Sequence, residues 1–439
     1  MITSISVENF KSYGARARLP LSPLTLLIGT NASGKSNLIE AIRLLSLLAH
    51  GRRLDDIFSS VQREDIAIRG TVRNLLYDGR DTFALGCTLS GETVGEWDEL
   101  QMRIKVSESD REMRLVEESI SSRSSVVPLY EIKHPAGRHS NEVQVAYNNF
   151  AQGGRKPLIP CTDQQAIFTQ LDTPSRFGRP ESQQHIPRVV LAYQQSLKSI
   201  LFLDPSPRQM RDYSFITEVD LLDDGRNLSS VLYHLCQNEG RKQDVLDFIS
   251  YLPEHEIRDI DFVMTPRREV MVKLVETFAC EEVERDAPVL SDGTLRVLAV
   301  AAALLSARAG SLVIIEEIDN GVHPSRAGQL LANIRRIATE RSLRVLLTSH
   351  NPALLDTLPS EAVPDVVACY RDPDEGDSRL VRLKDLRRYP ALAARGPLGH
   401  LMTEGILESY LKDQRSEEEE KEQAFSWLEE FEKQTATMD

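Results

Sequence analysis

The chain has 439 residues, of which 41% are hydrophobic and 27% are charged, and this composition excludes a largely disordered protein. That length can support two or three lobes with cores of their own. The formal net charge of −14 argues against a surface built mainly to grip DNA or anionic lipid, although a local basic groove is compatible with it.

The N-terminal residues "MITSISVENFKSYG" lack the charged start and the long apolar run of a signal peptide. No window approaches the ~18 uninterrupted apolar residues of a membrane helix, so we expect a cytosolic protein without a membrane partner. The cysteines lie far apart with no CxxC pair, which favours reduced structural thiols over zinc ligands or disulfides. They are Cys87, Cys161, Cys236, Cys280 and Cys369.

The first strong signal is a short apolar strand, Leu24 to Ile28, followed by "GTNASGKSNLIEAI" and a helix. Glycines let backbone N–H groups turn toward phosphate oxygens, and the helix N-terminus adds partial positive charge. Lys35 supplies a full charge, and the Ser36 hydroxyl can bind Mg²⁺. We therefore predict a P-loop that binds ATP and Mg²⁺, with these candidate residues: Gly29, Thr30, Asn31, Ala32, Ser33, Gly34, Lys35, Ser36 and Asn37.

The middle of the chain divides by pattern. Residues 66–148 contain alternating segments such as "IAIRGTVRNLL", "ELQMRIKV" and "EVQVAYNN", which predict an antiparallel sheet completing the nucleotide lobe. Between about 163 and 257, "QQAIFTQL", "VVLAYQQSLKSILF" and "NLSSVLYHLCQ" have helical spacing and predict a helical insertion. "IDFVMTPRREVMVKLVE" then reads as a hairpin.

A second anion site is predicted at "PVLSDGTLRVLAVAAALLSA", residues 288–307. Ser291, Asp292 and Gly293 open a long apolar helix whose N-terminus can face an anion, although such a start on its own is an ordinary helix cap. Its position 25 residues before a pair of glutamates, counted from Ser291 to Glu316, is what gives it interest.

That pair ends "LVIIEEIDNGVHPS", residues 312–325, where a buried strand runs into Glu316 and Glu317. Either the strand stops at the surface with both carboxylates in water, or a cation neutralises them. The P-loop favours the second reading, because an acidic residue at a neighbouring strand end holds the magnesium in such proteins. Glu316 then binds the metal, and Glu317 faces the γ-phosphate and orients the attacking water.

The last motif is "RVLLTSHNPALLD", a strand from Arg344 to Ser349 that ends in His350, 33 residues after Glu317. A single histidine at a strand end is often structural.

Taken in order, "NFKSYG", "GTNASGKSNLIEAI", "LSDGTLR", "IIEEIDNGVHPS" and "TSHNPALLD" resemble the ABC-type ATPases of the SMC, RecF and OLD branch. The resemblance is strongest to the short predicted-ATPase members found beside bacterial anti-phage effectors. It implies an α/β fold: an ABC-type P-loop ATPase head with an antiparallel β lobe and a helical insertion, and no long coiled coil.

The resemblance also implies roles for particular residues. Ser291, Asp292 and Gly293 would be the signature motif that contacts the γ-phosphate held by a partner subunit, and His350 would be the switch histidine. The loop at Asn320 would touch the partner. Lys11 is either a residue beside the adenine or an exposed lysine on a turn, and Gln62 is either a magnesium-contacting glutamine or a loop residue.

Departures from better-known relatives limit the analogy. The 255 residues from Ser36 to Ser291 show no sustained heptads and no CxxC apex, so the coiled coil and zinc hook of repair proteins are missing. The 89 residues after His350 lack a recognisable Toprim nuclease, and "DPDEGD", residues 372–377, reads as a hairpin turn. The acidic tail carries Trp427 among aromatic residues and would be a helix docked either on its own protein or on a partner.

We therefore expect four segments: residues 1–150 as the N-terminal ATPase half, 151–280 as a mainly helical insertion with the returning hairpin, 281–371 as the C-terminal half, and 372–439 as an extension. Two functions stay open. One is an ATPase that dimerises around ATP and, as sensor or scaffold, controls a separately encoded effector, such as a nuclease, in anti-phage defence. The other is a RecF-like repair ATPase acting directly on DNA.

Overall fold

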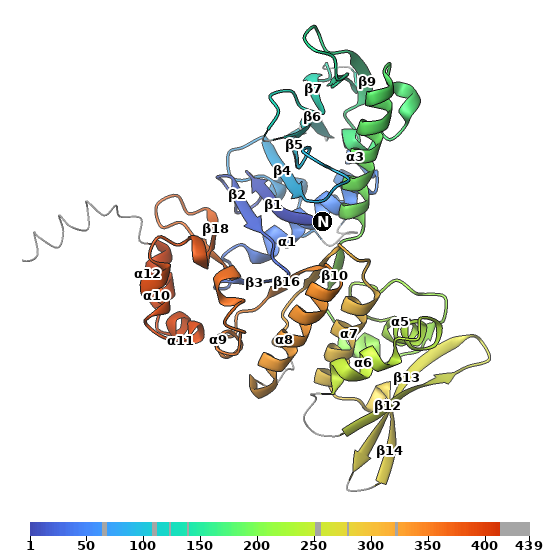
Figure 1. Cartoon of the computed structure of the whole chain (residues 1–439). Coiled ribbons are helices and arrows are strands. Elements are labelled where there is room, and N and C mark those ends of the chain that lie inside the picture. Colours follow the sequence, from blue (N-terminus) through green and yellow to red (C-terminus); the bar gives the residue numbers. More distant parts are fainter. Residues whose placement is uncertain are drawn as a thin grey trace, which may run out of the picture.

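The computed structural model describes residues 1–63, 68–107, 112–122, 124–137, 140–250, 256–278, 281–320 and 324–412. Figure 1 shows an elongated molecule: an antiparallel lobe at one end, a central sheet, and a smaller lobe of long strands at the other end. The C-terminal helices lie to one side of the central sheet.

The central sheet has six strands, and its order carries the site. Five are parallel, in the order β10-β15-β16-β3-β17, and β18 pairs with β17 antiparallel at the edge. The strands are β10 (Leu201–Leu203), β15 (Leu312–Ile315), β16 (Arg344–Thr348), β3 (Leu24–Ile28), β17 (Val367–Arg371) and β18 (Ser378–Arg382). β3 and β15 are buried at every position, as their uninterrupted apolar sequences predict for parallel strands covered on both faces.

Alternate residues of these strands enter two separate cores. In β15, Leu312 and Ile314 belong to the core shared with α1 (Lys35–Ala49), whereas Val313 and Ile315 belong to the core shared with α7 (Asp292–Ser306) and α8 (Pro324–Glu340). The P-loop helix α1 and the helix α7 therefore lie on opposite faces of the central sheet.

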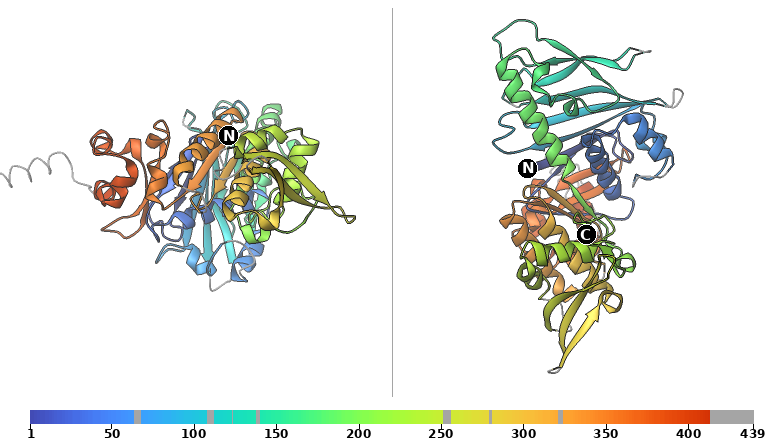
Figure 2. Two further views of the ribbon diagram at one scale, coloured as in Figure 1. Left: turned by 90° about the horizontal axis from the view of Figure 1, so that it is seen from below. Right: turned by 90° about the vertical axis from the view of Figure 1, so that its right-hand side faces the viewer.

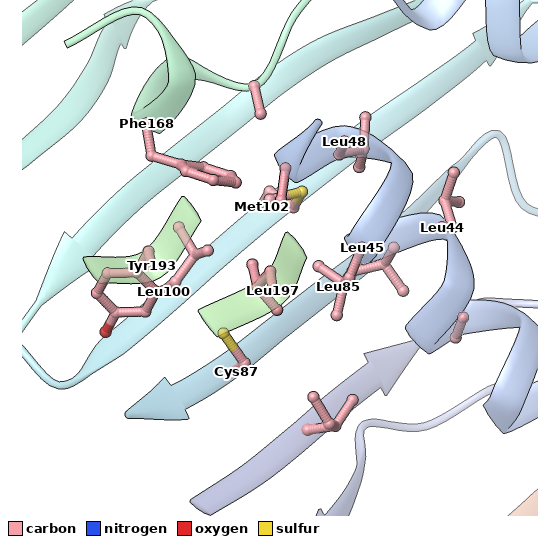
Figure 3. Close-up of a cluster of buried hydrophobic side chains, with 14 of the residues drawn as sticks. Leu44, Leu45, Leu48, Leu85, Cys87, Leu100, Met102, Phe168, Tyr193 and Leu197 are labelled. Atoms are coloured by element: carbon pink, nitrogen blue, oxygen red, sulfur yellow. The ribbon is translucent and has the colours of Figure 1, made fainter. Parts of the chain in front are cut away.

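An eight-stranded antiparallel sheet forms the N-terminal lobe, in the order β2-β1-β4-β5-β6-β7-β8-β9. Its strands are β1 (Ile2–Glu8), β2 (Ala17–Pro20), β4 (Thr82–Leu89), β5 (Glu99–Ser107), β6 (Glu112–Ser121), β7 (Tyr130–His134), β8 (Glu142–Tyr147) and β9 (Leu158–Thr162). Figure 3 shows leucines of α1 meeting side chains of β4, β5 and the long helix α3 (Pro180–Lys198) in one apolar cluster.

The predicted antiparallel lobe is confirmed at "ELQMRIKV" and "EVQVAYNN", but "IAIRGTVRNLL" is wrong as a strand. Its described part forms a 3₁₀ turn, Val72–Leu75, because the side chains of Thr71 and Asn74 cap the turn reciprocally. α2 (Leu54–Gln62) precedes it, and the side chain of Gln62 lies outside the described residues.

The segment predicted as a helical insertion is only partly helical. The helix α3 is confirmed, but "SILF" continues as β10 because it gains a ladder of hydrogen bonds beside β15, and "QQAIFTQL" holds only a 3₁₀ turn, Ile167–Thr169. Further helices are α4 (Pro207–Met210), α5 (Leu228–Tyr233), which continues as a π turn to Asn238, and α6 (Lys242–Ile249).

The predicted hairpin is confirmed as β12 (Glu256–Met264) and β13 (Glu269–Phe278). β13 also pairs with β14 (Glu281–Asp286) and with the short β11 (Ser214–Phe215), and β14 leads back toward α7. In Figures 1 and 2 this sheet projects from the end of the molecule opposite the antiparallel lobe.

At the edge of the central sheet, "DPDEGD" is confirmed as the turn between β17 and β18. The short helix α9 (Pro352–Leu355) lies between β16 and β17, and α10 (Tyr389–Ala393), α11 (Leu398–Thr403) and α12 (Ile406–Lys412) follow β18. The acidic tail and its predicted helix lie outside the described residues. In the part of the chain that the structure describes, no helix is long and apolar enough to cross a membrane, and the four described cysteines are buried free thiols.

Glu118 predicts a pH dependence of stability. Burial raises the pKa of this β6 carboxyl from 4.5 to about 7, although the Tyr130 hydroxyl and the N–H groups of Ile167 and Phe168 donate to it. The folded state therefore binds a proton that the unfolded state releases, so this stabilisation is full below pH ~4.5 and is lost as pH rises through ~7, by about 3 kcal/mol.

Urea unfolding of the parent and of Glu118→Gln at pH about 5 and about 8 tests this expectation. In the variant, the free energy of unfolding should still fall with rising pH, but less steeply, because burial also raises the pKa of Asp163, to about 6. Equal slopes in both proteins would contradict the assignment to Glu118.

Candidate functional site

The P-loop joins β3 to α1, and its backbone has positive φ angles that few residue types adopt. Gly29 and Gly34 have φ of 154° and 119°, and Ala32 also has a positive φ, 64°. Seven of the nine predicted loop residues, Asn31 to Asn37, line a cavity of about 540 Å³. The side chain of Asn37 meanwhile donates to Ser12 Oγ at 2.8 Å.

The other two predicted residues, Gly29 and Thr30, do not line the cavity but hold its lysine. Lys35 Nζ donates to Gly29 O at 2.5 Å and to Thr30 O at 3.1 Å. Burial lowers the pKa of Lys35, against the opposing charges of Cys369, Glu317 and Asp319. Two backbone carbonyls thus hold the ammonium at the loop, and Lys35 itself lines the cavity.

Gly34 gives a sharp test of the loop. An added Cβ would lie 2.3 Å from Ser378 Oγ, a hydroxyl that itself donates to Ser33 O at 2.5 Å. Gly34→Ala should therefore abolish nucleotide binding and lower the free energy of unfolding by about 2–4 kcal/mol, from overpacking and the unfavourable φ. Nucleotide titration and denaturant unfolding measure the two effects.

Gly51 is the matched control, because it follows the other end of the same helix with φ of 76° and nothing within 4 Å of an added Cβ. Gly51→Ala should cost about 1–2 kcal/mol and leave nucleotide binding intact. Parental nucleotide affinity in Gly34→Ala would mean that this loop does not bind the nucleotide.

The two glutamates come from the carboxyl end of β15. Because side chains alternate along the strand, Glu316 falls on the α1 face, where its backbone N–H donates to Leu203 O at 2.9 Å. Glu317 has φ of 50°, and its N–H donates to Thr348 Oγ1 at 3.0 Å. This left-handed turn carries the second carboxylate into the same cavity as the first.

His350 lies at the neighbouring strand end, after β16, and is an exposed residue of the cavity lining. β16 lies between β15 and β3 in the sheet, so the predicted histidine, both glutamates and the P-loop meet at one edge. Tertiary structure thus brings together residues that are up to 319 positions apart, counted from Asn31 to His350.

The predicted signature residues lie elsewhere. Ser291 caps α7 by accepting from Thr294 N at 3.1 Å, and Asp292 pairs with Arg211 at 2.6 Å. Ser291 and Asp292 are exposed, Gly293 is partly exposed, and none of the three lines the P-loop cavity.

Sequence reasoning missed several residues of the lining. Arg69, Gly70, Thr348, Ser349 and Arg371 contribute to it, and Arg371 donates to Ala32 O at 3.1 Å. No sequence motif assigns these residues to the site, because the folding of the chain brings them to the cavity.

Lys11 also lines the cavity, and it is not an exposed lysine on a turn. Its side chain is only 9% exposed, and its ammonium pairs with Glu40 of α1 and donates to Arg69 O at 2.7 Å. Arg69 Nε pairs with the other oxygen of Glu40 at 2.7 Å, so one buried carboxylate ties both basic residues to the end of the cavity.

Asp204 was also missed, although the sequence contains a pattern that could have predicted its position. "ILFLD" ends an apolar strand in a carboxylate just as "LVIIE" does, and β10 is the parallel neighbour of β15. Burial raises the pKa of Asp204, with Glu317 adding to the effect, and burial also raises that of Glu316, with Asp204 adding and Arg43 opposing. Three carboxylates therefore lie near one edge of the sheet, Glu316 partly exposed and Asp204 and Glu317 exposed, and a cation there would stabilise them.

The residues present fit a magnesium ion. Ser36 is exposed within the cavity and Glu316 lines it too, which offers a hydroxyl and a carboxylate as hard oxygen ligands. The described residues contain no group of three His, Cys, Asp or Glu side chains that could hold a metal alone. Mg²⁺ commonly takes its remaining ligands from phosphates and water.

Two family models match the chain. Residues 1–112 match the family "AAA ATPase domain", and residues 168–356 match the family "AAA domain, putative AbiEii toxin, Type IV TA system". The first contains the P-loop, and the second contains α7, both glutamates and His350.

Individual relatives agree with these matches. An "ATP/GTP phosphatase" of Helicobacter pylori is 20% identical over 366 residues, which cover 82% of this chain and 87% of that protein. The "DNA replication and repair protein RecF" of Gloeobacter violaceus is 33% identical over 105 residues, 24% of this chain and 23% of that protein.

Among solved structures, an SMC head bound to the C-terminal winged-helix domain of ScpA aligns with a TM-score of 0.48 at 12% identity and covers 87% of this chain and 96% of that one. The SMC head domain from Thermotoga maritima aligns with a TM-score of 0.41 at 12% identity, covering 87% and 98%. Both scores are under 0.5, and we conclude nothing about this chain from them. The two family models and the RecF relative, together with the P-loop cavity, support an ATPase that resembles the RecF type.

Proposed function

We propose that the protein binds ATP with Mg²⁺, pairs two copies head to tail around two nucleotides, and hydrolyses ATP to reset the pair. The observation that carries this proposal is that the predicted signature residues lie outside the P-loop cavity of their own chain. Glu317, His350 and the P-loop share one cavity, whereas Ser291 and Gly293 sit outside it at a solvent-accessible helix N-terminus. A γ-phosphate in the cavity would therefore lack the dipole of α7 until a second copy supplies it.

Within one copy, each side chain has a role that follows from its chemistry. Lys35 would bind the β- and γ-phosphates, and Ser36 and Glu316 would hold the metal, which neutralises phosphate charge when bound. Glu317 would accept a hydrogen bond from the attacking water and orient it. His350 would donate to a γ-phosphate oxygen.

Light scattering of the purified protein tests the pairing. We expect a monomer without nucleotide and a dimer with ATP and Mg²⁺, most visibly when hydrolysis is blocked. A mass that does not change with nucleotide, in protein that binds ATP, would contradict the head-to-tail arrangement.

For the biological role we propose a sensor or scaffold that holds a separately encoded effector, such as a nuclease, in anti-phage defence. Two observations support it: the second family's description names a toxin of a toxin–antitoxin system, and the net charge of −14 does not favour a DNA-gripping surface. Co-expression with the products of adjacent genes, followed by addition of ATP, tests it. Release of a bound gene product by ATP but not by ADP is the expected result.

The RecF relative supports a second candidate, an ATPase that loads directly on duplex DNA. Neutralising several phosphates makes affinity fall steeply with salt, so a loader should bind a labelled duplex at low salt and lose it at higher salt. A scaffold should bind poorly at both. Fluorescence anisotropy across a salt series distinguishes the two functions.

A further inference from the structure

Arg43 of α1 lies behind the site and contacts three groups that no motif connects. Its side chain is 14% exposed, and its guanidinium carbon stands 4.2 Å above the centre of the Phe202 ring. One terminal nitrogen pairs with Asp223, and the other lies 3.9 Å from Glu316 Oε1. Arg43 is not among the residues that line the P-loop cavity.

Strand register explains why these groups meet. Phe202 of β10 is opposite Ile314 of β15, and both enter the core on the α1 face. Two residues beyond Ile314, Glu316 returns to that face. Arg43 is eight residues, or about two turns, after Lys35 on the same helix, so one helix presents a cation to the phosphate site and another to the carboxylate behind it.

We propose that Arg43 is a positioning residue for Glu316, fixing the carboxylate in the orientation that receives the metal. This inference rests on the proposed function, in which Glu316 is the metal ligand. Arg43 approaches one oxygen of Glu316, Oε1, and Glu316 itself lines the cavity. A planar guanidinium held over an aromatic ring has little freedom, so it holds its ion-pair partner in one orientation, as partners of metal-binding carboxylates commonly do.

The Asp223 contact anchors the guanidinium from the other side. Asp223 O accepts from Asp204 N at 2.8 Å, and Asp224 O accepts from Ser206 N at 2.9 Å, so the loop that carries Asp223 is fastened to the segment leaving β10. Arg43 is therefore held by ring, loop and carboxylate together. A purely structural ion pair would use the same contacts, and only a metal-dependent readout separates the two roles.

The decisive measurement is nucleotide affinity as a function of Mg²⁺, read with a fluorescent ATP analogue. Arg43→Met keeps a long apolar side chain over Phe202 but removes the charge. We expect the Mg²⁺ concentration for half-maximal binding to rise about 10- to 100-fold, while affinity in EDTA stays parental. Parental Mg²⁺ dependence in a folded Arg43→Met protein, with or without a lower Tm, would overturn the inference.

Arg43→Lys keeps the test decisive if the methionine variant does not fold. Lysine keeps the charge but cannot fork between two carboxylates, so its Mg²⁺ requirement should lie between parent and Arg43→Met. A parental requirement in the lysine variant would count against orientation by the guanidinium.

Two further variants separate this inference from the proposed function. Arg103 bridges two carboxylates, Glu8 at 3.4 Å and Glu117 at 3.2 Å, on the antiparallel sheet, so Arg103→Met is the matched control and should leave Mg²⁺ dependence unchanged. Glu316→Gln should raise the Mg²⁺ requirement at least as much as Arg43→Met. If Glu316→Gln has no effect, the metal assignment itself fails, whereas an effect of Glu316→Gln without one of Arg43→Met removes only the role of Arg43.

If Arg43 acts through Glu316, the two changes should not add. The double variant should need no more Mg²⁺ than Glu316→Gln alone, because the group that Arg43 orients is already lost. Full additivity would place Arg43 on a separate path and overturn its assignment to Glu316.

Discussion

Glu317→Gln is expected to slow ATP turnover by at least ~100-fold while ATP still binds, because the substitution removes only the charged oxygen that orients and polarises water. The surroundings should survive the change. Asn320 Nδ2 donates to Glu317 Oε2, and a glutamine can offer its carbonyl oxygen to the same donor. Steady-state phosphate release and nucleotide titration check the two halves of this expectation.

Trapped dimers should accumulate in the same variant, since the ATP that joins two copies is no longer hydrolysed. Glu340→Gln on α8 is the matched control, because that glutamate pairs with Arg336 at 3.0 Å far along the helix from the site. Parental turnover in Glu317→Gln would leave the second glutamate without a role in hydrolysis.

The parallel strands of the central sheet were predictable where an apolar run is followed directly by a motif of polar residues. β3 and β15 have the expected bounds, and β16 ends one residue early, because strands buried on both faces leave an uninterrupted apolar signal. The same signal was present in "ILFLD", but the preceding helix α3 has helical spacing that continues into it. The parallel pairing with β15, from Leu201 opposite Val313 to Leu203 opposite Ile315, makes that segment a strand.

The residues that line the cavity were largely predictable from the sequence, but the residues that contact and position them were not. Lys35, Glu316 and His350 stand in sequence motifs and line one cavity, whereas the residues that hold this edge of the sheet come from long-range packing. Arg43 on Phe202 and Thr348 on the Glu317 amide depend on which strands become neighbours. No local pattern encodes that order, so a single sequence cannot supply it.

Ser291→Arg should abolish ATP-dependent dimerisation while leaving single-copy nucleotide affinity intact. A bulky cation would stand where the partner's γ-phosphate should lie, but Ser291 is outside the cavity of its own chain. The change also removes a helix cap, the bond from Thr294 N to Ser291 Oγ. Ser291→Ala measures that loss separately, and it should cost about 1 kcal/mol of stability without preventing dimers.

Mixing two inactive variants tests whether the site is shared between copies. In a heterodimer of Lys35→Ala with Ser291→Arg, one composite site carries both defects and the other carries neither. ATPase activity should therefore return to roughly half the parental rate per heterodimer if the two sites work independently. Activity that stays absent although heterodimers form would show that the sites are coupled or that the geometry is wrong. A Ser291→Arg protein that dimerises and hydrolyses ATP like the parent would reduce "LSDG" to an ordinary helix cap, because a site complete within one chain has no use for a second copy's α7.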